Sequence, residues 1–131
     1  MQHNDTILVT GSTGMMGSAL MRRLLADGYG KVIAPTHAAL ELKDAQAVNA
    51  YVERHNPDYV FHLAARVGGI HANNTYPAEF IFDNTAMQLN VFETARKAGV
   101  KKILFPGSAC TYPSDGQGST PGRRCSRIND S

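Results

Sequence analysis

The sequence predicts an α/β fold in which a parallel sheet is doubly wound, with helices on both of its faces. Three observations support this prediction. Short apolar segments rich in β-branched residues alternate with segments of helical periodicity, the connections are short, and a glycine-rich turn joins the first apolar segment to the first helical one. Right-handed crossovers between parallel strands leave a doubly wound sheet as the simplest topology.

The first part of the chain predicts two strands around one helix. Residues 6–10 are apolar and β-branched and end at a glycine, which predicts a buried strand. From Met15 apolar residues recur every four positions, so we expect a helix, with Gly28 as its left-handed C-terminal cap. Residues 31–35 predict the second strand, and residues 39–42 a short third strand.

The second part continues the alternation of helix and strand. Asp44 is an expected N-cap for a helix that ends at Pro57. Residues 58–63 predict the next strand, residues 78–98 the longest helix, and residues 102–105 the last strand. Because that last strand would end the sheet, we expect it to be an exposed apolar edge.

The chain of 131 residues is long enough for one domain. We assign residues 1–113 to this domain. Residues 114–131 are polar, with Ile128 as the single aliphatic residue, and therefore bury too little surface to offset their ordering entropy. We expect them to form a disordered tail.

Composition argues against several classes of protein. The formal charge is +2 and the basic residues are scattered, which does not favour nucleic-acid binding. The two cysteines, Cys110 and Cys125, lack metal-ligand spacing, so no metal site is predicted. No signal peptide and no apolar run of about 20 residues is present, so we expect no membrane association and a cytoplasmic location.

The glycine-rich turn carries the first functional prediction. Gly11 permits the turn out of the strand, Gly14 lets a pyrophosphate approach the backbone, and Gly17 lets the helix pack close to the sheet. The alternative is a tight connection without a ligand, but the position of the turn between strand and helix favours an NAD(P)-binding Rossmann fold. The residues expected to contact the cofactor here are Gly11, Ser12, Thr13, Gly14, Met15, Met16 and Gly17.

The end of the second strand bears on the choice between NAD and NADP. A carboxylate there would favour the ribose 2′-hydroxyl of NAD, and an arginine would favour the 2′-phosphate of NADP. Residues 35–38 contain neither, but a protonated His37 could pair with a phosphate. An exposed loop histidine without a role is the alternative. We expect NADP(H), with NAD(H) not excluded.

Two segments resemble a known family. Residues 57–77, with the run Val-Gly-Gly-Ile-His-Ala-Asn at residues 67–73, and residues 107–113 are similar to the GDP-L-fucose synthases, which are extended short-chain dehydrogenases/reductases. The likeness covers residues 6–113. It implies an NADPH-dependent epimerase and reductase that converts GDP-4-keto-6-deoxy-mannose to GDP-fucose. Family members form homodimers through long helices that are partly absent here.

The resemblance also implies roles for individual residues. Ser108 would hydrogen-bond the 4-keto oxygen of the GDP-sugar, and Cys110 would take part in the proton transfers of epimerisation. The turn expected to line the nicotinamide is Leu63, Ala64 and Ala65, and the residues expected to border the hexose are Val67, Gly68 and Gly69.

The chemistry of these residue types agrees with such roles. Ser108 and Cys110 follow the carboxyl end of a strand, where open α/β sheets bind ligands. A hydroxyl there can stabilise an oxyanion, and a thiol can exchange a proton with a carbon acid, although either side chain could also serve packing alone. We interpret His62 as a core histidine whose polar atoms are hydrogen-bonded, rather than as an acid/base group, and Asn84 as a residue that bonds nearby backbone.

One family feature is missing. No tyrosine in the 131 residues is followed four positions later by lysine, and that pair protonates the carbonyl in this superfamily. We therefore expect a fold that is incomplete at its C-terminal side and a chain inactive alone, with a frameshift or premature stop as the hypothesis for its tail. The alternatives are a non-catalytic nucleotide-binding module, another sugar-nucleotide epimerase or dehydratase, and an interaction protein that uses the exposed edge.

Overall fold

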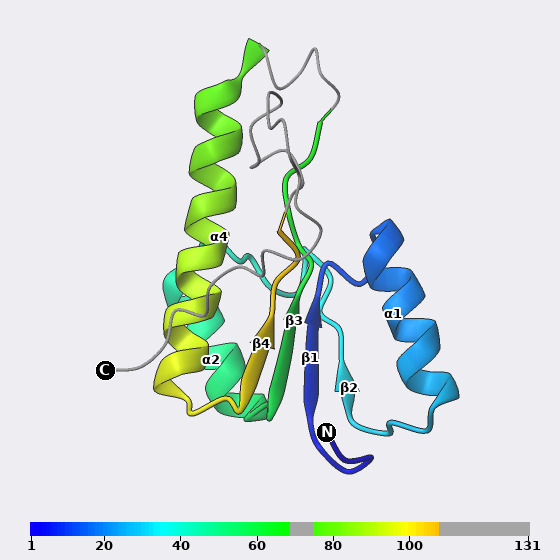
Figure 1. The fold of residues 1–131 in the computed structure, drawn as a ribbon. Helices are drawn as coiled ribbons and strands as arrows, with labels where there is room; N and C mark the ends of the chain where they lie inside the picture. Colours follow the sequence, from blue (N-terminus) through cyan, green and yellow to red (C-terminus); the bar gives the residue numbers. More distant parts are fainter. Residues whose placement is uncertain (69–74, 108–131) are drawn as a thin grey trace, which may run out of the picture.

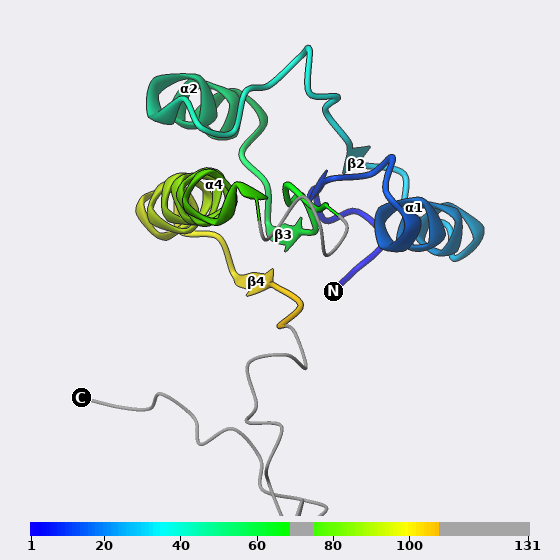
Figure 2. The same ribbon diagram turned by 90° about the horizontal axis from the view of Figure 1, so that it is seen from above.

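A computed structural model of the chain describes residues 1–68 and 75–107, which form a parallel sheet between layers of helices (Figure 1). The strand order is β2-β1-β3-β4, and every pair is parallel. Viewed from above, α1 covers one face of the sheet, and α2 and α4 cover the other (Figure 2). The predicted fold class is confirmed. The elements are β1 (Ile7–Thr10), α1 (Met15–Ala26), β2 (Val32–Ile33), α2 (Ala45–His55), β3 (Tyr59–His62), α4 (Pro77–Lys97) and β4 (Lys102–Leu104).

Strand β1 is buried along its whole length because both faces of the sheet are covered. Ile7 and Val9 belong to a cluster with Leu24 of α1. Leu8, which points to the opposite face, packs with a cluster that includes Val52 of α2 and other residues of α2 and α4. A strand covered on both sides favours apolar residues on both faces, which explains the run Ile7, Leu8 and Val9; the buried hydroxyl of Thr10 is hydrogen-bonded to His62.

The helix ends follow the local signals in the sequence. Oδ1 of Asp44 accepts hydrogen bonds from the backbone N–H groups of Gln46 and Ala47, at 2.9 and 3.1 Å. Asn56 takes a left-handed conformation (φ 43°) at the other end of α2. Gly28 does the same (φ 83°) after α1, as expected from its position.

The prediction of a strand at residues 39–42 is wrong. The backbone N–H groups of Ala39 and Leu40 both donate to the carbonyl of Thr36 at 3.0 Å, so the chain turns back on itself. Leu40 and Leu42 are buried in the cluster beneath α2 and α4. Two apolar residues separated by one polar residue are typical of a strand, but here a turn buries both.

An ion-pair cluster fixes the end of the sheet where the strands begin. Nζ of Lys101 lies 2.8 Å from Oδ1 of Asp58 and 3.2 Å from Oδ1 of Asp5. The second oxygen of Asp58 accepts a hydrogen bond from the N–H of Thr6 at 2.8 Å. The hydrogen bond from Lys101 holds the pKa of the Asp58 carboxyl below its usual value. These contacts join the starts of β1, β3 and β4.

Strand β4 pairs with β3 and, within residues 1–68 and 75–107, with no other strand. Leu104 is 48% exposed and Phe105 is 40% exposed. The expected apolar edge is therefore present in this part of the chain. In the same part, none of the helices combines the length and the apolar character that crossing a lipid bilayer requires.

Candidate functional site

A cavity of about 870 Å³ lies at the carboxyl ends of β1, β2 and β3. Its walls are the loops that follow these three strands and the side of α4 that faces them. This volume falls in the range of about 300–1,000 Å³ that is typical of small-molecule and cofactor sites. The lining residues that the sequence analysis singled out are Gly11, Ser12, Thr13, Gly14, Met15, Met16, Gly17, His37, Leu63, Ala64, Ala65 and Val67.

Gly11 is required for two separate reasons. Its φ of 74° is a conformation that other L-residues rarely adopt. A Cβ at this position would also lie 2.5 Å from the backbone nitrogen of Ala64 and 2.7 Å from the carbonyl carbon of Leu63. Gly11 therefore lets the turn after β1 touch the turn after β3, and the two form one continuous wall.

Gly17 and Gly14 differ in what surrounds them. A Cβ on Gly17 would lie 2.0 Å from the carbonyl oxygen of Gly11, so this glycine lets α1 pack against the backbone of the glycine turn. Because Gly11 directly follows β1, this contact also brings α1 close to the end of that strand. A Cβ on Gly14 would meet the Gly11 oxygen at 3.4 Å and otherwise open space. Gly14 is thus the position where a ligand can approach the backbone.

The N-terminus of α1 opens toward the same cavity. Gly14 is the N-cap, no side chain caps the helix, and no acidic residue lies in its first turn. The N–H groups of a first turn have no partner within the helix, and they carry the positive end of the helix dipole. Met15 and Met16 line the cavity at this point. The arrangement can bind an anionic group.

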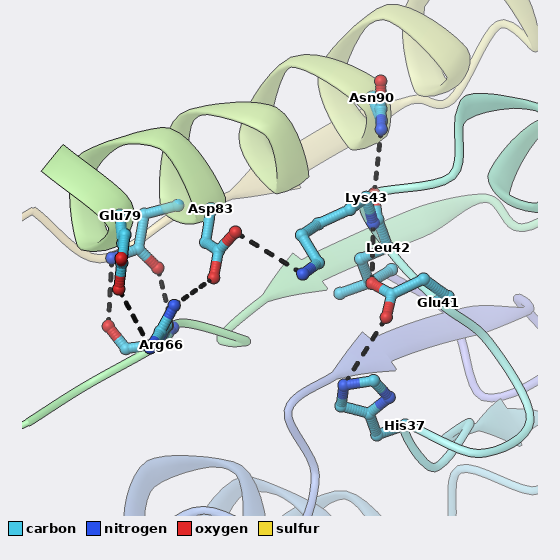
Figure 3. Close-up of polar contacts among 9 residues, drawn as sticks. His37, Glu41, Leu42, Lys43, Arg66, Glu79, Asp83 and Asn90 are labelled. Carbon is cyan, nitrogen blue, oxygen red and sulfur yellow. Dashed lines mark hydrogen bonds and ion pairs between the residues drawn. The ribbon is translucent and has the colours of Figure 1, made fainter.

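A histidine–carboxylate pair forms the wall that follows β2. Nε2 of His37 lies 3.6 Å from Oε2 of Glu41 (Figure 3). The other oxygen of Glu41 accepts a hydrogen bond from the backbone N–H of Lys43 at 3.0 Å. The sequence analysis found no acid at the end of the second strand. Glu41 reaches this place because the segment is a turn and not a strand.

Asp83 of α4 joins two basic residues along the cavity. Its Oδ2 lies 2.6 Å from Nη1 of Arg66, and its Oδ1 lies 3.4 Å from Nζ of Lys43 (Figure 3). The guanidinium group of Arg66 also lies 4.7 Å from the ring centroid of Phe80 and 3.9 Å from Glu79. The hydrogen bond from Arg66 is the main cause that lowers the pKa of the Asp83 carboxyl.

Two asparagines of α4 hold the backbone of the loops that line the cavity. Oδ1 of Asn84 accepts from the N–H of Arg66 at 2.7 Å, and Nδ2 of Asn84 donates to the carbonyl of Arg66 at 3.0 Å. Nδ2 of Asn90 donates to the carbonyl of Leu42 at 2.9 Å. The interpretation of Asn84 as a backbone-bonding residue is confirmed. Helix α4 thereby fixes both the loop after β3 and the loop before α2.

His62 lies beneath the cavity in the core. Its side chain is fully buried, and Nδ1 is 2.7 Å from Oγ1 of Thr10 on the neighbouring strand. The rings of Phe92 and Phe105 pack on it with centroid distances of 6.1 and 5.7 Å. Burial lowers the pKa of His62 to about 4, so the ring is neutral near pH 7. Its place in the core is confirmed, but the expectation that its polar atoms are all hydrogen-bonded is not, because Nε2 has no hydrogen-bond partner in the described part.

Several predicted site residues are not among the described residues that line the cavity. Ser108, Cys110, Gly69 and the tail of residues 114–131 lie outside the described residues. Gly68 is described and is not among the lining residues. The lining residues that the sequence analysis did not single out are Thr10, Pro35, Thr36, Leu40, Glu41, Leu42, Lys43, Arg66, Asp83 and Met87. Most of them follow β2. A strand was expected at residues 39–42, so these residues were not expected to line the cavity.

Comparison with known proteins gives consistent matches. Residues 7–128 match the model of the NAD dependent epimerase/dehydratase family. The chain is 48% identical to GDP-L-fucose synthase 1 of Arabidopsis thaliana over 107 residues, which cover 82% of this chain and 33% of that protein. It is 41% identical to GDP-L-fucose synthase of Escherichia coli (strain K12) over 107 residues, with the same coverage of each chain.

Two solved structures with similar folds have NADP bound. The structure of MlghC, a GDP-mannoheptose C4 reductase from Campylobacter jejuni with NADP bound, has a TM-score of 0.85 and 33% identity, and the match covers 94% of this chain and 38% of that one. A GDP-L-fucose synthetase from Naegleria fowleri bound to NADP has a TM-score of 0.75 and 33% identity, with 87% and 34% covered. The chain spans about a third of the length of these relatives.

Proposed function

The chain belongs to the NAD dependent epimerase/dehydratase family, and from this premise we propose that it is the NADP(H)-binding portion of a GDP-L-fucose synthase. The observation that carries the proposal is the cavity at the carboxyl ends of the strands, in which the glycine turn forms one wall. Ligands of open α/β sheets bind at this edge, and dinucleotides bind at a turn of this kind.

The pyrophosphate lies over Gly14 at the N-terminus of α1. The open space at the Gly14 Cβ position, the missing side-chain cap and the absence of an acid in the first turn support this placement. Backbone N–H groups of the turn donate to the phosphate oxygens, and the helix dipole adds a favourable potential. The 2′-phosphate of the adenosine ribose faces His37 across the cavity.

The nicotinamide half lies along the turn after β3. Leu63, Ala64 and Ala65 line the cavity there; the two alanines leave room for a planar ring, and the three apolar side chains exclude water from it. The contacts of Asn84 with the Arg66 backbone keep this turn in place. The bound cofactor would supply hydride to the carbonyl carbon of a keto-sugar.

The sugar side of the proposal rests on the family resemblance. The substrate is GDP-4-keto-6-deoxy-mannose, bordered by Val67, Gly68 and Gly69. Ser108 donates a hydrogen bond to its keto oxygen, and Cys110 exchanges a proton during epimerisation. Because no tyrosine in the 131 residues is followed four positions later by lysine, the chain alone binds the cofactor without completing the reduction.

Cofactor binding is tested by titrating the chain with NADPH and measuring the change in fluorescence at each addition. Gly14→Leu places a side chain where the pyrophosphate lies, so we expect the Kd for NADPH to rise at least about tenfold. The matched control is Gly30→Leu, since a Cβ on Gly30 meets nothing within 4 Å and this glycine does not line the cavity. Equal Kd values for both variants would contradict the site, and turnover of the keto-sugar by the chain would contradict its inactivity.

A further inference from the structure

We propose that Arg66 is a positioning residue for the nicotinamide half of the cofactor. Its guanidinium group ties the end of the turn after β3 to helix α4, and thereby keeps Ala65 in place along the cavity. The inference rests on the proposed function, which places the nicotinamide along this turn. Arg66 acts here through the protein and not by contact with the cofactor.

The turn after β3 is held by different elements at its two ends. At its start, the N–H groups of Leu63 and Ala64 donate to the carbonyl and the hydroxyl of Thr10, at 3.1 and 3.4 Å. At its other end, the backbone N–H and carbonyl of Arg66 both bond to Asn84 of α4. The residue between these two anchors therefore depends on α4 as well as on β1.

The guanidinium group of Arg66 adds three contacts with α4. Nη1 lies 2.6 Å from Oδ2 of Asp83, and Nη2 lies 3.9 Å from Oε2 of Glu79 (Figure 3). The guanidinium carbon lies 4.7 Å from the ring centroid of Phe80, close enough for a cation to be attracted to the ring. Because both terminal nitrogens face carboxylates of α4, the group is placed to hold the turn rather than to bind a phosphate of the cofactor.

The ion pair between Arg66 and Asp83 is partly shielded from water. The side chain of Asp83 is 14% exposed, and the hydrogen bond from Arg66 lowers the pKa of its carboxyl. A short charge-assisted hydrogen bond with little access to water is stronger than an average surface ion pair. When it is lost, fewer chains hold the turn in the binding arrangement, and the apparent Kd for the cofactor rises as that fraction falls.

The experiment measures two Kd values by isothermal titration calorimetry of the full chain. One ligand is NADPH, and the other is adenosine 2′,5′-bisphosphate, which lacks the nicotinamide half. Arg66→Met keeps the apolar stem of the side chain and removes the guanidinium group. We expect it to raise the Kd for NADPH about fivefold and to leave the Kd for the bisphosphate within about twofold.

The bisphosphate separates positioning from a general loss of structure, because a damaged fold would bind both ligands more weakly. The matched control is Arg96→Met, which removes the ion pair between Arg96 and Glu93 on the same helix and outside the cavity. This control should change neither Kd. An unchanged Kd for NADPH in Arg66→Met, or an equal rise for both ligands, would overturn the inference and leave the proposed function standing.

A double variant tests whether Arg66 acts through Asp83. In the background of Asp83→Asn the partner carboxylate is already lost, so Arg66→Met should raise the Kd for NADPH by less than about twofold further. An undiminished fivefold effect in that background would mean that Arg66 contacts the cofactor directly, which contradicts the inference. If the unmodified chain binds neither ligand, the proposed function itself fails.

Discussion

Single buried residues connect the core of this protein to its cavity. The Thr10–His62 contact joins two neighbouring strands directly below the glycine turn, and Oγ1 of Thr10 also lies 3.4 Å from the N–H of Ala64. A charged imidazole at this position would lie against the rings of Phe92 and Phe105, and no carboxylate of the described residues pairs with it. Burial therefore favours the neutral form of the ring.

His62 makes the stability of the fold dependent on pH. Its pKa is about 4 in the folded chain and about 6.5 in an unfolded one, so the unfolded state binds more protons between these values. The stabilisation is complete above about pH 6.5 and decreases as the pH falls toward 4. Between pH 7.5 and 4.5 we expect this histidine to lower the free energy of unfolding by roughly 2 to 3 kcal/mol.

The measurement is urea denaturation at both pH values for the chain and for His62→Leu. Acidic groups such as Asp58 titrate in both proteins, so the difference between them isolates the histidine. The variant should lose less stability on acidification, whereas His55→Gln on α2 should behave like the unmodified chain. Equal losses in His62→Leu and the unmodified chain would rule out the assigned pKa.

The residues of the site differ in how far their positions can be predicted from neighbouring residues in the sequence. Gly11 to Gly17 and the cap at Asp44 could be predicted because a turn or a cap depends on a few neighbouring residues. The core position of His62 could be predicted from its apolar strand, but its partner Thr10 is 52 positions away and gives no local signal. Glu41 was missed because its place depends on the turn that precedes it.

At the scale of elements, α4 organises the cavity. It supplies Asp83, Asn84 and Asn90, which hold the loop after β3 and the loop before α2. Its bounds, Pro77–Lys97, lie within one residue of the predicted 78–98 at each end. The agreement is close because helical periodicity over a long segment is a strong signal. Its contacts with the loops could not be predicted, since they depend on how the helix is rotated against the sheet.

The Asp83 ion pairs should matter for cofactor binding. Asp83→Asn removes the charge that holds Arg66 and Lys43, and the freed loops then spend less time in the binding arrangement. We expect a higher Kd for NADPH in this variant. Added salt should raise the Kd of the unmodified chain more than that of the variant, because salt screens exposed ion pairs.

The matched control lies on the same helix. Glu93 forms ion pairs with Arg96 at 2.9 Å and Lys97 at 3.4 Å, and none of these residues lines the cavity. Glu93→Gln removes the same number of charges from α4 and should leave the Kd for NADPH within about twofold. A similar Kd in both variants would mean that Asp83 has no specific role at the site.

At the scale of the molecule, the described sheet has one face covered by α1 and the other by α2 and α4 (Figure 2). A doubly wound parallel sheet could be predicted from the alternation of strands and helices, but its strand order β2-β1-β3-β4 was not predicted. The length of each strand could not be predicted either. In β2, for example, only Val32 and Ile33 pair with β1, although residues 31–35 were expected to form the strand. Of the other residues in the expected second strand, Pro35 lines the cavity.

The edge at β4 leads to a prediction about self-association. Within residues 1–68 and 75–107 the outer side of β4 has no pairing strand, and Leu104 is 48% exposed on it. An unpaired apolar edge is a template for another chain, and a charged side chain on it opposes such pairing. We therefore expect the chain to form larger species as its concentration rises, and Leu104→Lys to remain monomeric under the same conditions. Sedimentation velocity distinguishes the two. Leu25→Lys changes a leucine on α1 that is 60% exposed and lies away from the edge, so it should associate like the unmodified chain. An unmodified chain that stays monomeric at every concentration, or a Leu25→Lys variant that prevents association equally well, would show that the edge is not the contact.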